Sequence, residues 1–519
     1  MPNGRASLVL ICGLITGTLA HPAFAQSGIP EVRFFVQGYT VEGDNPLDEK
    51  STQKILSAYA GEHFGLTALK AAADELESGI RDAGFSFRRV IVPPQRLGDG
   101  IVTLRIVDFK LGAISVSGNK HFSEENILAS LPGLTVDEVP SARSMSRSVR
   151  FANEHPAKKV VLTFRESETE NAVDARLKVR DEKPWNVFGL ANNTGTKETG
   201  EERLSIGAQH NNVWNRDHEA TFSYTTSPDQ TQNVQQGAII YSWPIYRVSG
   251  DVGAYAVQSE VDSGVIANAF EVAGRGVFFG LSYTQHLGVI GRYSQKASAG
   301  VENKAFENDV NFQGSQLGTD VRSVPLSLSY LGNFRSVNYE TGFSLTYASN
   351  LSTGSSNDDA TYSATRAGAR ADWDALRYKA NFGYFFTGGW SARFALAGQV
   401  ADQPLIPGEQ FGVGGATSVR GFDERAVSGD SGTRISLEAG TPAFFGVNGK
   451  LFYDAGRVEL ENAQPGEIAS EQISSVGIGA AWRWRRFVSL NVDAAEVIDG
   501  TTSVKDGETK AHVSLYARF

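Results

Sequence analysis

The sequence predicts a transmembrane β-barrel of about 16 antiparallel strands, preceded by two small α+β modules. Three observations support this fold class. Residues 182–519 contain recurrent alternation of apolar and polar residues, residues 31–181 mix helical and strand patterns, and the chain begins with an export signal. Beyond that signal, no run of roughly 18 apolar residues is present, so the sequence offers no transmembrane helix.

Residues 1–25 are predicted to form a secretory signal peptide. Arg5 supplies a positive charge, residues 8–20 are apolar, and Ala23-Phe24-Ala25 has the A-x-A pattern of a cleavage site. Cys12, the only cysteine of the chain, lies inside this segment. The mature chain is therefore expected to have no thiol for catalysis, for disulfides or for a thiolate metal site.

The composition narrows the classes of function. The net charge of −10 argues against a nucleic-acid partner. The hydrophobic content of 41% is low and the 55 glycines are many, which suits either a large secreted β-protein or a barrel with a polar interior. A soluble β-sandwich gives the same strand period. We favour the barrel because so many strands follow one another without a second core-forming pattern.

Two consecutive segments, residues 26–109 and 110–181, are predicted to be related modules. Each has the order strand, helix, helix, strand, strand. Asp48 and Ser123 are suited to cap the first helix of each module, because their side-chain oxygens accept hydrogen bonds from free backbone N–H groups. One face of the second helix of the first module is apolar and is expected to be buried; it consists of Leu69, Ala72, Ala73, Leu76 and Ile80.

Strand alternation is clearest at the end of the predicted barrel, residues 182–519. In residues 476–485, apolar side chains that end in Trp482 and Trp484 alternate with Gly, Ala and Arg. The apolar face is suited to lipid and the small or polar face to a wet lumen. The last strand alternates in the same way and ends at Phe519, the final residue.

A glycine-rich loop, residues 403–433, surrounds Arg420 between two predicted barrel strands. In a later strand, the period of two places Phe452, Asp454 and Gly456 on the lumen face. A carboxylate that is shielded from water needs a counter-charge, and an arginine can supply it through a bidentate contact. The alternative is a surface loop with a solvated arginine.

The motif Ser418–Phe422, which contains Val419, Arg420, Gly421 and Phe422, resembles the VRG-aromatic loop tip of two-partner secretion transporters. Phe452, Asp454 and Gly456 match the F-x-D-x-G pattern of the same superfamily. With two preceding modules, the chain resembles the TpsB-type haemolysin secretion/activation family (ShlB/FhaC/HecB). The resemblance implies that residues 26–109 and 110–181 are POTRA modules. It also implies that Arg420 contacts Asp454 inside the barrel, and that Phe519 is the C-terminal barrel signal.

The same resemblance implies a function in protein export. The barrel would lie in the bacterial outer membrane, in contact with its lipid, with the POTRA modules in the periplasm. The modules would recognise a dedicated large exoprotein, which would be exported unfolded and without ATP. The barrel-assembly machinery would act only during biogenesis. No enzyme activity, catalytic residue, metal or cofactor is expected. The alternative is an assembly or insertion factor for outer-membrane β-barrel proteins.

One feature of the sequence departs from that family. Only residues 26–30 lie between the expected cleavage site and the first module strand, which is short for the plug helix that many members carry. We therefore expect the lumen loop to close the barrel without such a helix.

Overall fold

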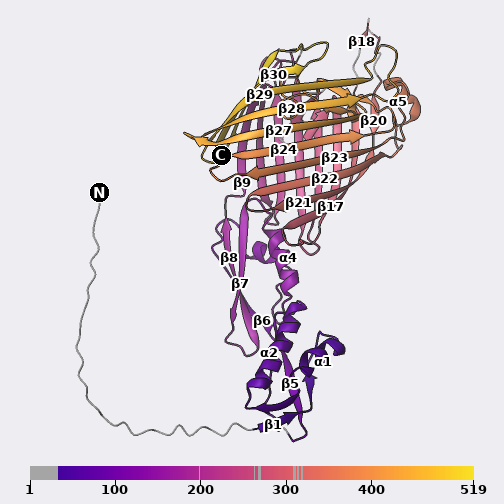
Figure 1. Cartoon of the computed structure of the whole chain (residues 1–519). Helices are drawn as coiled ribbons and strands as arrows, with labels where there is room; N and C mark the ends of the chain where they lie inside the picture. Colours follow the sequence, from indigo (N-terminus) through magenta and orange to yellow (C-terminus); the bar gives the residue numbers. More distant parts are fainter. Residues whose placement is uncertain are drawn as a thin grey trace, which may run out of the picture. The chain divides into compact units, whose positions relative to one another are not determined.

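The computed structural model describes residues 33–96, 98–197, 199–261, 263–266, 270–307, 311–312, 315–316 and 319–519 (Figure 1). The predicted signal peptide lies outside these residues. The chain divides into two compact units between Asp108 and Phe109. None of the helices in the described part of the chain is long and apolar enough to cross a membrane.

The first unit is a small α+β module. Its elements are β1 (Arg33–Val36), β2 (Gly38–Glu42), α1 (Glu49–Ser57), β3 (Gly61–Phe64), α2 (Thr67–Asp82), β4 (Arg88–Ile91) and β5 (Ile101–Asp108). Strand β5 lies between β2, which it pairs in parallel, and β4, which it pairs antiparallel. All five predicted apolar residues of α2 are buried, and Asp48 caps α1 by accepting a hydrogen bond of 2.8 Å from the Ser51 backbone N–H.

The sequence did not predict strand β3, which pairs with β1. This strand reads Gly-Glu-His-Phe, too short and too polar to give a strand signal of its own. It forms because β1 offers it a neighbouring backbone with which to pair.

The second unit begins with a module of the same design. Its elements are β6 (Lys110–Ser117), α3 (Glu124–Ala129), α4 (Ala142–Ala152), β7 (Lys158–Glu166) and β8 (Ala172–Asp181). Strand β8 lies between β6, in parallel, and β7, antiparallel, as β5 does in the first module. Ser123 caps α3. We call this part of the chain the second module.

A closed antiparallel barrel follows. Its strands are β9 (Trp185–Asn192), β10 (Arg203–Val213), β11 (His218–Thr226), β12 (Gln235–Ile245), β13 (Gly250–Ser259), β16 (Gly276–His286), β17 (Tyr293–Phe306), β20 (Val321–Ser323), β21 (Pro325–Arg335), β22 (Tyr339–Asn350), β23 (Asp374–Phe385), β24 (Ser391–Val400), β27 (Ser431–Phe444), β28 (Val447–Glu459), β29 (Ser470–Trp484), β30 (Val488–Asp499) and β31 (Thr509–Arg518).

Within the described residues these segments make sixteen spanning strands, because β20 and β21 are one strand that is interrupted at Val324. Both segments pair with β17. Pro325 follows the break, and proline has no N–H to give to a ladder. The predicted fold class, an N-terminal α+β module followed in the sequence by a barrel of about 16 strands, is confirmed.

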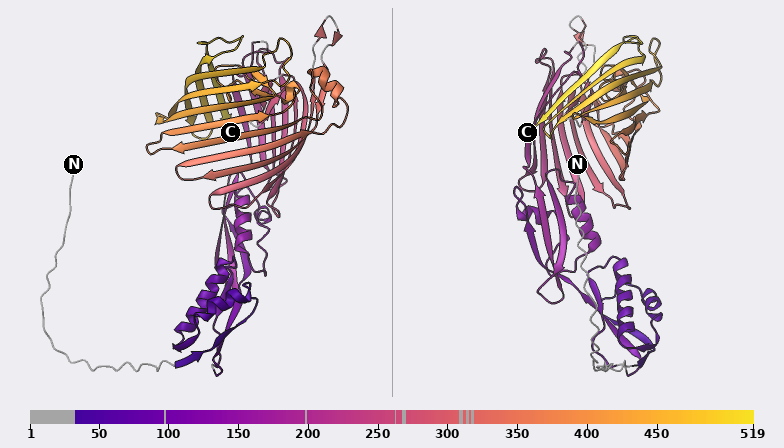
Figure 2. Two further views of the ribbon diagram at one scale, coloured as in Figure 1. Left: turned by 45° about the vertical axis from the view of Figure 1, so that its right-hand side comes forward. Right: turned by 60° about the vertical axis from the view of Figure 1, so that its left-hand side comes forward.

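The barrel strands run obliquely around the wall (Figure 2), as closure of a barrel requires. Outward-facing side chains such as Ile206, Leu328 and Ile478 are large, apolar and exposed. Six of the seven tryptophans are also exposed: Trp185, Trp214, Trp243, Trp390, Trp482 and Trp484. All six lie at or next to the end where short turns such as Phe445–Gly446 join the strands. This arrangement is typical of an interfacial aromatic girdle.

The barrel closes where β31 meets β9, along five residue pairs. Beyond the end of β9, the side chain of Asn193 continues the ladder. Its Nδ2 donates to the Ala511 carbonyl at 2.7 Å, and its Oδ1 accepts from the Val513 N–H at 2.8 Å. At the other end, Phe519 exchanges backbone hydrogen bonds with Val187.

Longer connections join the strands at the opposite end of the barrel. They contain the hairpins β14 (Ser263–Ile266)–β15 (Phe270–Ala273) and β18 (Asn311–Phe312)–β19 (Ser315–Gln316), helix α5 (Asp359–Thr365), the 3-10 turn η1 (Pro407–Glu409), β25 (Phe411–Val413) and β26 (Val427–Gly429). The connection that contains η1, β25 and β26 runs from 401 to 430, against the expected 403–433, and we call it the lumen loop.

Candidate functional site

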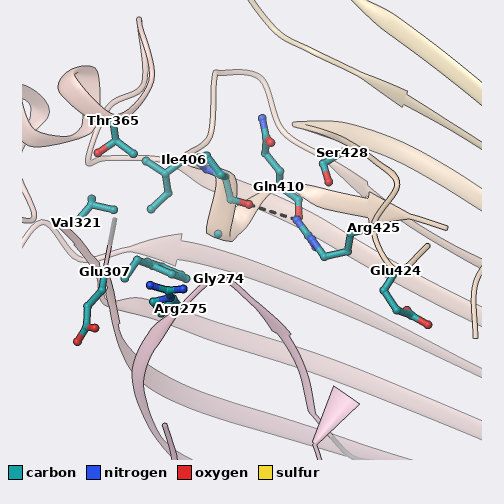
Figure 3. Close-up of a pocket in the computed structure, with 13 residues that line it drawn as sticks. Gly274, Arg275, Glu307, Val321, Thr365, Ile406, Gln410, Glu424, Arg425 and Ser428 are labelled. Atoms are coloured by element: carbon teal, nitrogen blue, oxygen red, sulfur yellow. Dashed lines mark hydrogen bonds between the residues drawn. The ribbon is translucent and has the colours of Figure 1, made fainter. Parts of the chain in front are cut away.

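The lumen loop has two parts. Residues 401–413 and 427–430 form a stem, in which β25 and β26 pair antiparallel, and residues 414–426 form a tip. The guanidinium of Arg425 donates to the carbonyls of Pro407 and Gln410 at 3.3 and 3.1 Å, which ties the tip to the stem (Figure 3).

The tip begins at Gly414 and Gly415, whose φ angles are 119° and 105°. L-residues with a side chain rarely adopt such angles. A Cβ on Gly414 would also lie 2.6 Å from the carbonyl oxygen of Asp423. Glycine at this position is therefore a requirement of the backbone path, which turns sharply to bring the tip against the barrel wall.

Arg420 and Asp454 form a bidentate ion pair inside the barrel. Arg420 Nε lies 2.6 Å from Asp454 Oδ2, and Nη2 lies 2.9 Å from Oδ1. The backbone N–H of Arg420 donates to Oδ2 at 3.2 Å, and the Ser436 hydroxyl donates to Oδ1 at 2.6 Å. Both residues are buried. The structure thus brings together the two charged residues that the sequence singled out.

Arg420 has further acidic neighbours that the sequence did not single out. Its Nη1 lies 2.8 Å from Glu438 Oε1 and 3.4 Å from Asp493 Oδ2. Lys450 donates to the same Asp493 oxygen at 2.8 Å. Two cations and three carboxylates therefore meet at the tip. No motif marks Glu438, Lys450 or Asp493; only their position on the inward face of β27, β28 and β30 could have indicated them.

The other predicted residues of the motif surround this pair. The Phe452 ring lies under Arg420, whose Cζ is 3.4 Å from the ring centroid. Val419 and Phe422 are fully buried in a cluster with Val413, Val427, Val458, Ile473 and Val497. A side chain at Gly456 would collide with Val413, because a Cβ there would lie 2.4 Å from it.

Gly421 has a φ of 98°, and its N–H donates to His512 Nε2 on β31 at 3.0 Å. Phe519, the predicted C-terminal signal, is exposed at the end of the barrel. It therefore lies apart from the cluster around Arg420.

A second buried polar cluster joins the second module to the barrel. The side chain of Lys158 on β7 is wholly buried, and its Nζ contacts both Asp217 Oδ2 and Asn126 Oδ1. Asp217 lies in the turn between β10 and β11, and Tyr246, from the next turn, donates its hydroxyl to Asp217 Oδ2. Burial lowers the pKa of Lys158, and Asp217 opposes that effect.

Glu154 makes a second contact between the second module and the barrel. Its two carboxylate oxygens lie 3.1 Å from His286 Nδ1 and 2.7 Å from Lys296 Nζ. Burial alone would raise the pKa of Glu154, but the hydrogen bonds from His286 and Lys296 outweigh it and lower the pKa to about 2. Glu154 therefore remains a carboxylate at physiological pH.

His155 is a titratable side chain that is buried at the same junction. Its Nδ1 accepts from the Ala157 N–H at 3.2 Å, so Nε2 carries the proton and donates to the Asn211 carbonyl at 2.6 Å. Burial lowers the pKa of His155 below 6.5. The negative charge of Asp217 acts in the opposite direction but does not outweigh burial. As pH falls below 6.5, the unfolded chain takes up a proton that the folded chain does not, so the folded junction loses stability.

We therefore expect the free energy of unfolding of the second module to fall as the pH is lowered below about 6.5, by at most about 1.4 kcal/mol per pH unit from this group. His155→Gln keeps a donor for Asn211 and is expected to flatten the change, as measured by thermal unfolding at each pH. An equal slope in both proteins would show that His155 is not the group responsible.

Comparisons with known proteins agree on the family. The family model described as haemolysin secretion/activation protein ShlB/FhaC/HecB matches residues 172–482, and the model described as POTRA domain, ShlB-type, matches residues 34–108. The chain is 23% identical over 473 residues to the heme/hemopexin transporter protein HuxB of Haemophilus influenzae strain 86-028NP, in a match that covers 87% of this chain and 81% of HuxB.

Solved structures agree on the fold. CdiB from Escherichia coli matches with a TM-score of 0.72 and 16% identity, over 95% of this chain and 92% of CdiB. CdiB from Acinetobacter baumannii matches with a TM-score of 0.66 and 17% identity, over 94% and 90% of the two chains. The first family model matches more than half of the chain. This protein therefore belongs to the haemolysin secretion/activation protein ShlB/FhaC/HecB family, the two-partner secretion transporters of the outer membrane.

Proposed function

We propose that this transporter exports one dedicated large exoprotein, which it binds in the periplasm through its two modules and passes unfolded through the barrel. Residues 26–109 and 110–181 act as POTRA modules on the periplasmic side. The observation that carries the proposal is the lumen loop, whose tip is held against the barrel wall by ion pairs at Arg420. Polar contacts of this kind can be exchanged for contacts with water or with a passing chain, so the tip is suited to act as a gate.

The modules offer the client extended backbone and apolar surface. In each three-stranded sheet the central strand is fully paired, whereas β2, β4, β6 and β7 are edges. An unfolded segment can add to such an edge through main-chain hydrogen bonds, which make no strict demand on its sequence. Phe35, Phe64 and Leu66 of the first module are 60%, 56% and 63% exposed, and they would contact apolar side chains of the client.

Export in this scheme requires no ATP at the outer membrane. The edge strands of the modules bind the client, and release of the tip of the lumen loop from the wall opens the barrel lumen. Folding of the client outside the cell then makes its return unfavourable. The role of the chain is therefore to bind, to open and to close again, and the barrel-assembly machinery is needed only to insert it.

The proposal is tested by deleting the gene in its native bacterium and comparing the proteins of the culture medium and of the outer membrane by mass spectrometry. We expect one large protein to disappear from the medium, and the wild-type gene to restore it. A chain that lacks residues 33–108 is expected to restore the barrel in the membrane but not the secreted protein. If several outer-membrane barrel proteins decline instead, the chain acts as an assembly factor.

A further inference from the structure

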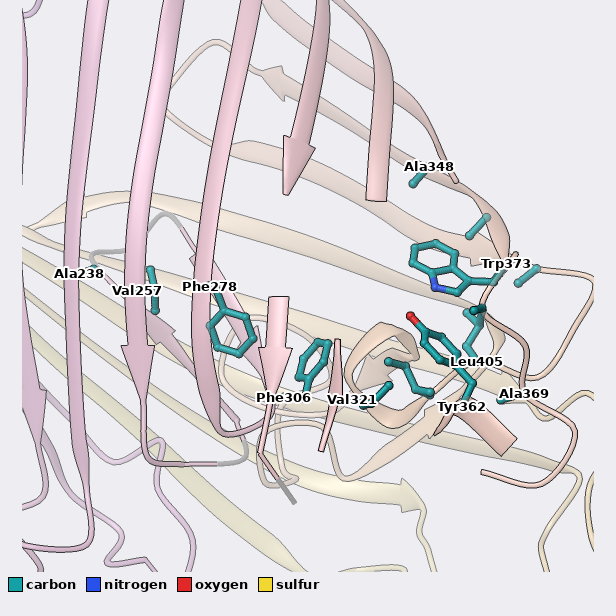
Figure 4. Packing of buried hydrophobic residues seen from close by; sticks show 14 residues of the cluster. Ala238, Val257, Phe278, Phe306, Val321, Ala348, Tyr362, Ala369, Trp373 and Leu405 are labelled. Carbon is teal, nitrogen blue, oxygen red and sulfur yellow. The ribbon is translucent and has the colours of Figure 1, made fainter. Parts of the chain in front are cut away.

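The stem of the lumen loop is fixed to the barrel by contacts distinct from those of the tip. Leu405 and Ile406 are fully buried in a hydrophobic cluster with Tyr362, Trp373 and Phe306 (Figure 4). This cluster joins the connection that carries α5 to the inner wall of the barrel. The stem therefore begins inside a packed core, and a core of this kind resists small displacements.

Glu409, which lies three residues after Ile406 in the stem, is almost completely buried. Arg377 Nη2 donates to its Oε2 at 2.9 Å, and Lys304 Nζ lies 3.3 Å from both carboxylate oxygens. Lys304 also pairs with Glu302 at 3.1 Å. The negative charges of the two carboxylates are thus balanced by the positive charges of Lys304 and Arg377. Because a buried carboxylate is costly without a counter-charge, Glu409 holds this part of the stem against β17 and β23.

The two segments of the stem, residues 401–413 and 427–430, are also hydrogen-bonded to β24 and to each other. Gln399 Nε2 donates to the backbone carbonyls of Glu409 and Asp430, at 3.0 Å each. Asp430 accepts hydrogen bonds from Arg366 Nη2 and from the Leu405 N–H, both at 2.8 Å. The stem thus has several fixed points before the tip begins.

The charged and polar partners of Glu409 in the stem and of Arg420 in the tip lie on different strands, although the apolar part of the stem around Val413 also packs against β28. The charged and polar side chains that bind Glu409 come from β17, β23 and β24, whereas those that bind Arg420 come from β27, β28 and β30. The chain passes from one set to the other through Gly414 and Gly415, whose positive φ angles mark the turn. Contacts on both sides of a glycine pair allow one side to be released while the other stays bound.

We propose that the lumen loop consists of a fixed stem and a releasable tip, and that Glu409 is the positioning residue that anchors the stem and so directs Arg420 to Asp454. The tip moves about Gly414 and Gly415, while the stem remains bound to β17, β23 and β24. The consequence for export rests on the proposed role of the loop as a gate. The motion itself is measurable without any client, so failure of one proposal is distinguishable from failure of the other.

Single introduced cysteines measure the exposure of the stem and of the tip separately. This is possible because Cys12, in the predicted signal peptide, is the only native cysteine. Val419→Cys introduces the tip thiol and Leu405→Cys introduces the stem thiol; both positions are fully buried. The measurement is the rate at which a membrane-impermeant maleimide labels each thiol in isolated outer membranes. Heat-modifiable migration on gels verifies that every variant forms the barrel.

Arg420→Glu is expected to raise the labelling rate of the tip thiol by about tenfold or more and to leave that of the stem thiol unchanged. Glu409→Gln is expected to raise both rates, and Arg377→Gln, which removes the same ion pair from the wall, is expected to act like it. The exchange Glu409→Arg with Arg377→Glu should return both rates toward wild type. Glu459→Gln, at an exposed carboxylate near the end of β28, is the matched control and should change neither rate.

Two results would overturn the inference. If Arg420→Glu exposes the stem thiol as much as the tip thiol, the loop moves as one body with a single anchor. If Glu409→Gln and Arg377→Gln leave both rates at the wild-type value, the stem is held by its hydrophobic contacts alone and Glu409 does not position the tip.

Discussion

Arg420→Glu is expected to reduce secretion of the client to below about a tenth of the wild-type level and to raise the conductance of the purified channel. The substitution places a fourth carboxylate beside Asp454, Glu438 and Asp493, with Lys450 as the remaining cation of the cluster. Breaking a buried ion pair costs about 3–5 kcal/mol locally when the remaining charge stays buried. The tip is therefore expected to leave the wall. Secretion assays and planar-bilayer recordings measure the two effects.

Two further variants separate loss of the pair from a change of lumen charge. Arg434→Glu makes the same change of charge on β27, at a residue in register with Gly456 rather than with Asp454, and should have a much smaller effect. The exchange Arg420→Glu with Asp454→Arg restores the ion pair and should recover part of the secretion and of the low conductance. If the exchange is no better than the single variants, the contact between Arg420 and Asp454 is not what holds the tip.

Lys158→Met is expected to lower the free energy of unfolding of the second module by about 3 kcal/mol. The side chain of Lys158 is wholly buried and neutralises Asp217. Methionine is of similar length, so the main loss is the counter-charge of a buried carboxylate. The second module is then expected to detach from the turn between β10 and β11. Thermal unfolding and hydrogen exchange of β7 and α3 in detergent-solubilised protein measure the change.

The double variant Lys158→Met with Asp217→Asn is expected to be more stable than Lys158→Met alone, because it removes the stranded charge and keeps hydrogen-bonding groups for Asn126 and Tyr246. Lys159→Met is the control: Lys159 is the next residue and is exposed, and it bonds carbonyls of its own module. If the single and double variants lose the same free energy of unfolding, Lys158 does not stabilise the buried carboxylate of Asp217.

Local sequence patterns were sufficient for much of the fold. Alternation in residues 476–485 predicted the strand that becomes β29, and the spacing of apolar residues predicted the buried face of α2. Strand β3 and the break at Val324 were not predicted. The first forms only through its pairing with β1, and the second depends on which neighbours a strand acquires when the barrel closes.

The sequence likewise predicted only part of the candidate site. The sequence by itself determined that Arg420 lies in a glycine-rich turn and that Asp454 is on an inward face, because turn chemistry and the period of a strand are local properties. Only the tertiary structure decided that Glu438, Lys450 and Asp493 join them, that Glu409 is held by β17 and β23, and that Lys158 meets Asp217. These partners are far apart in the chain, and barrel closure and the docking of the second module bring them together.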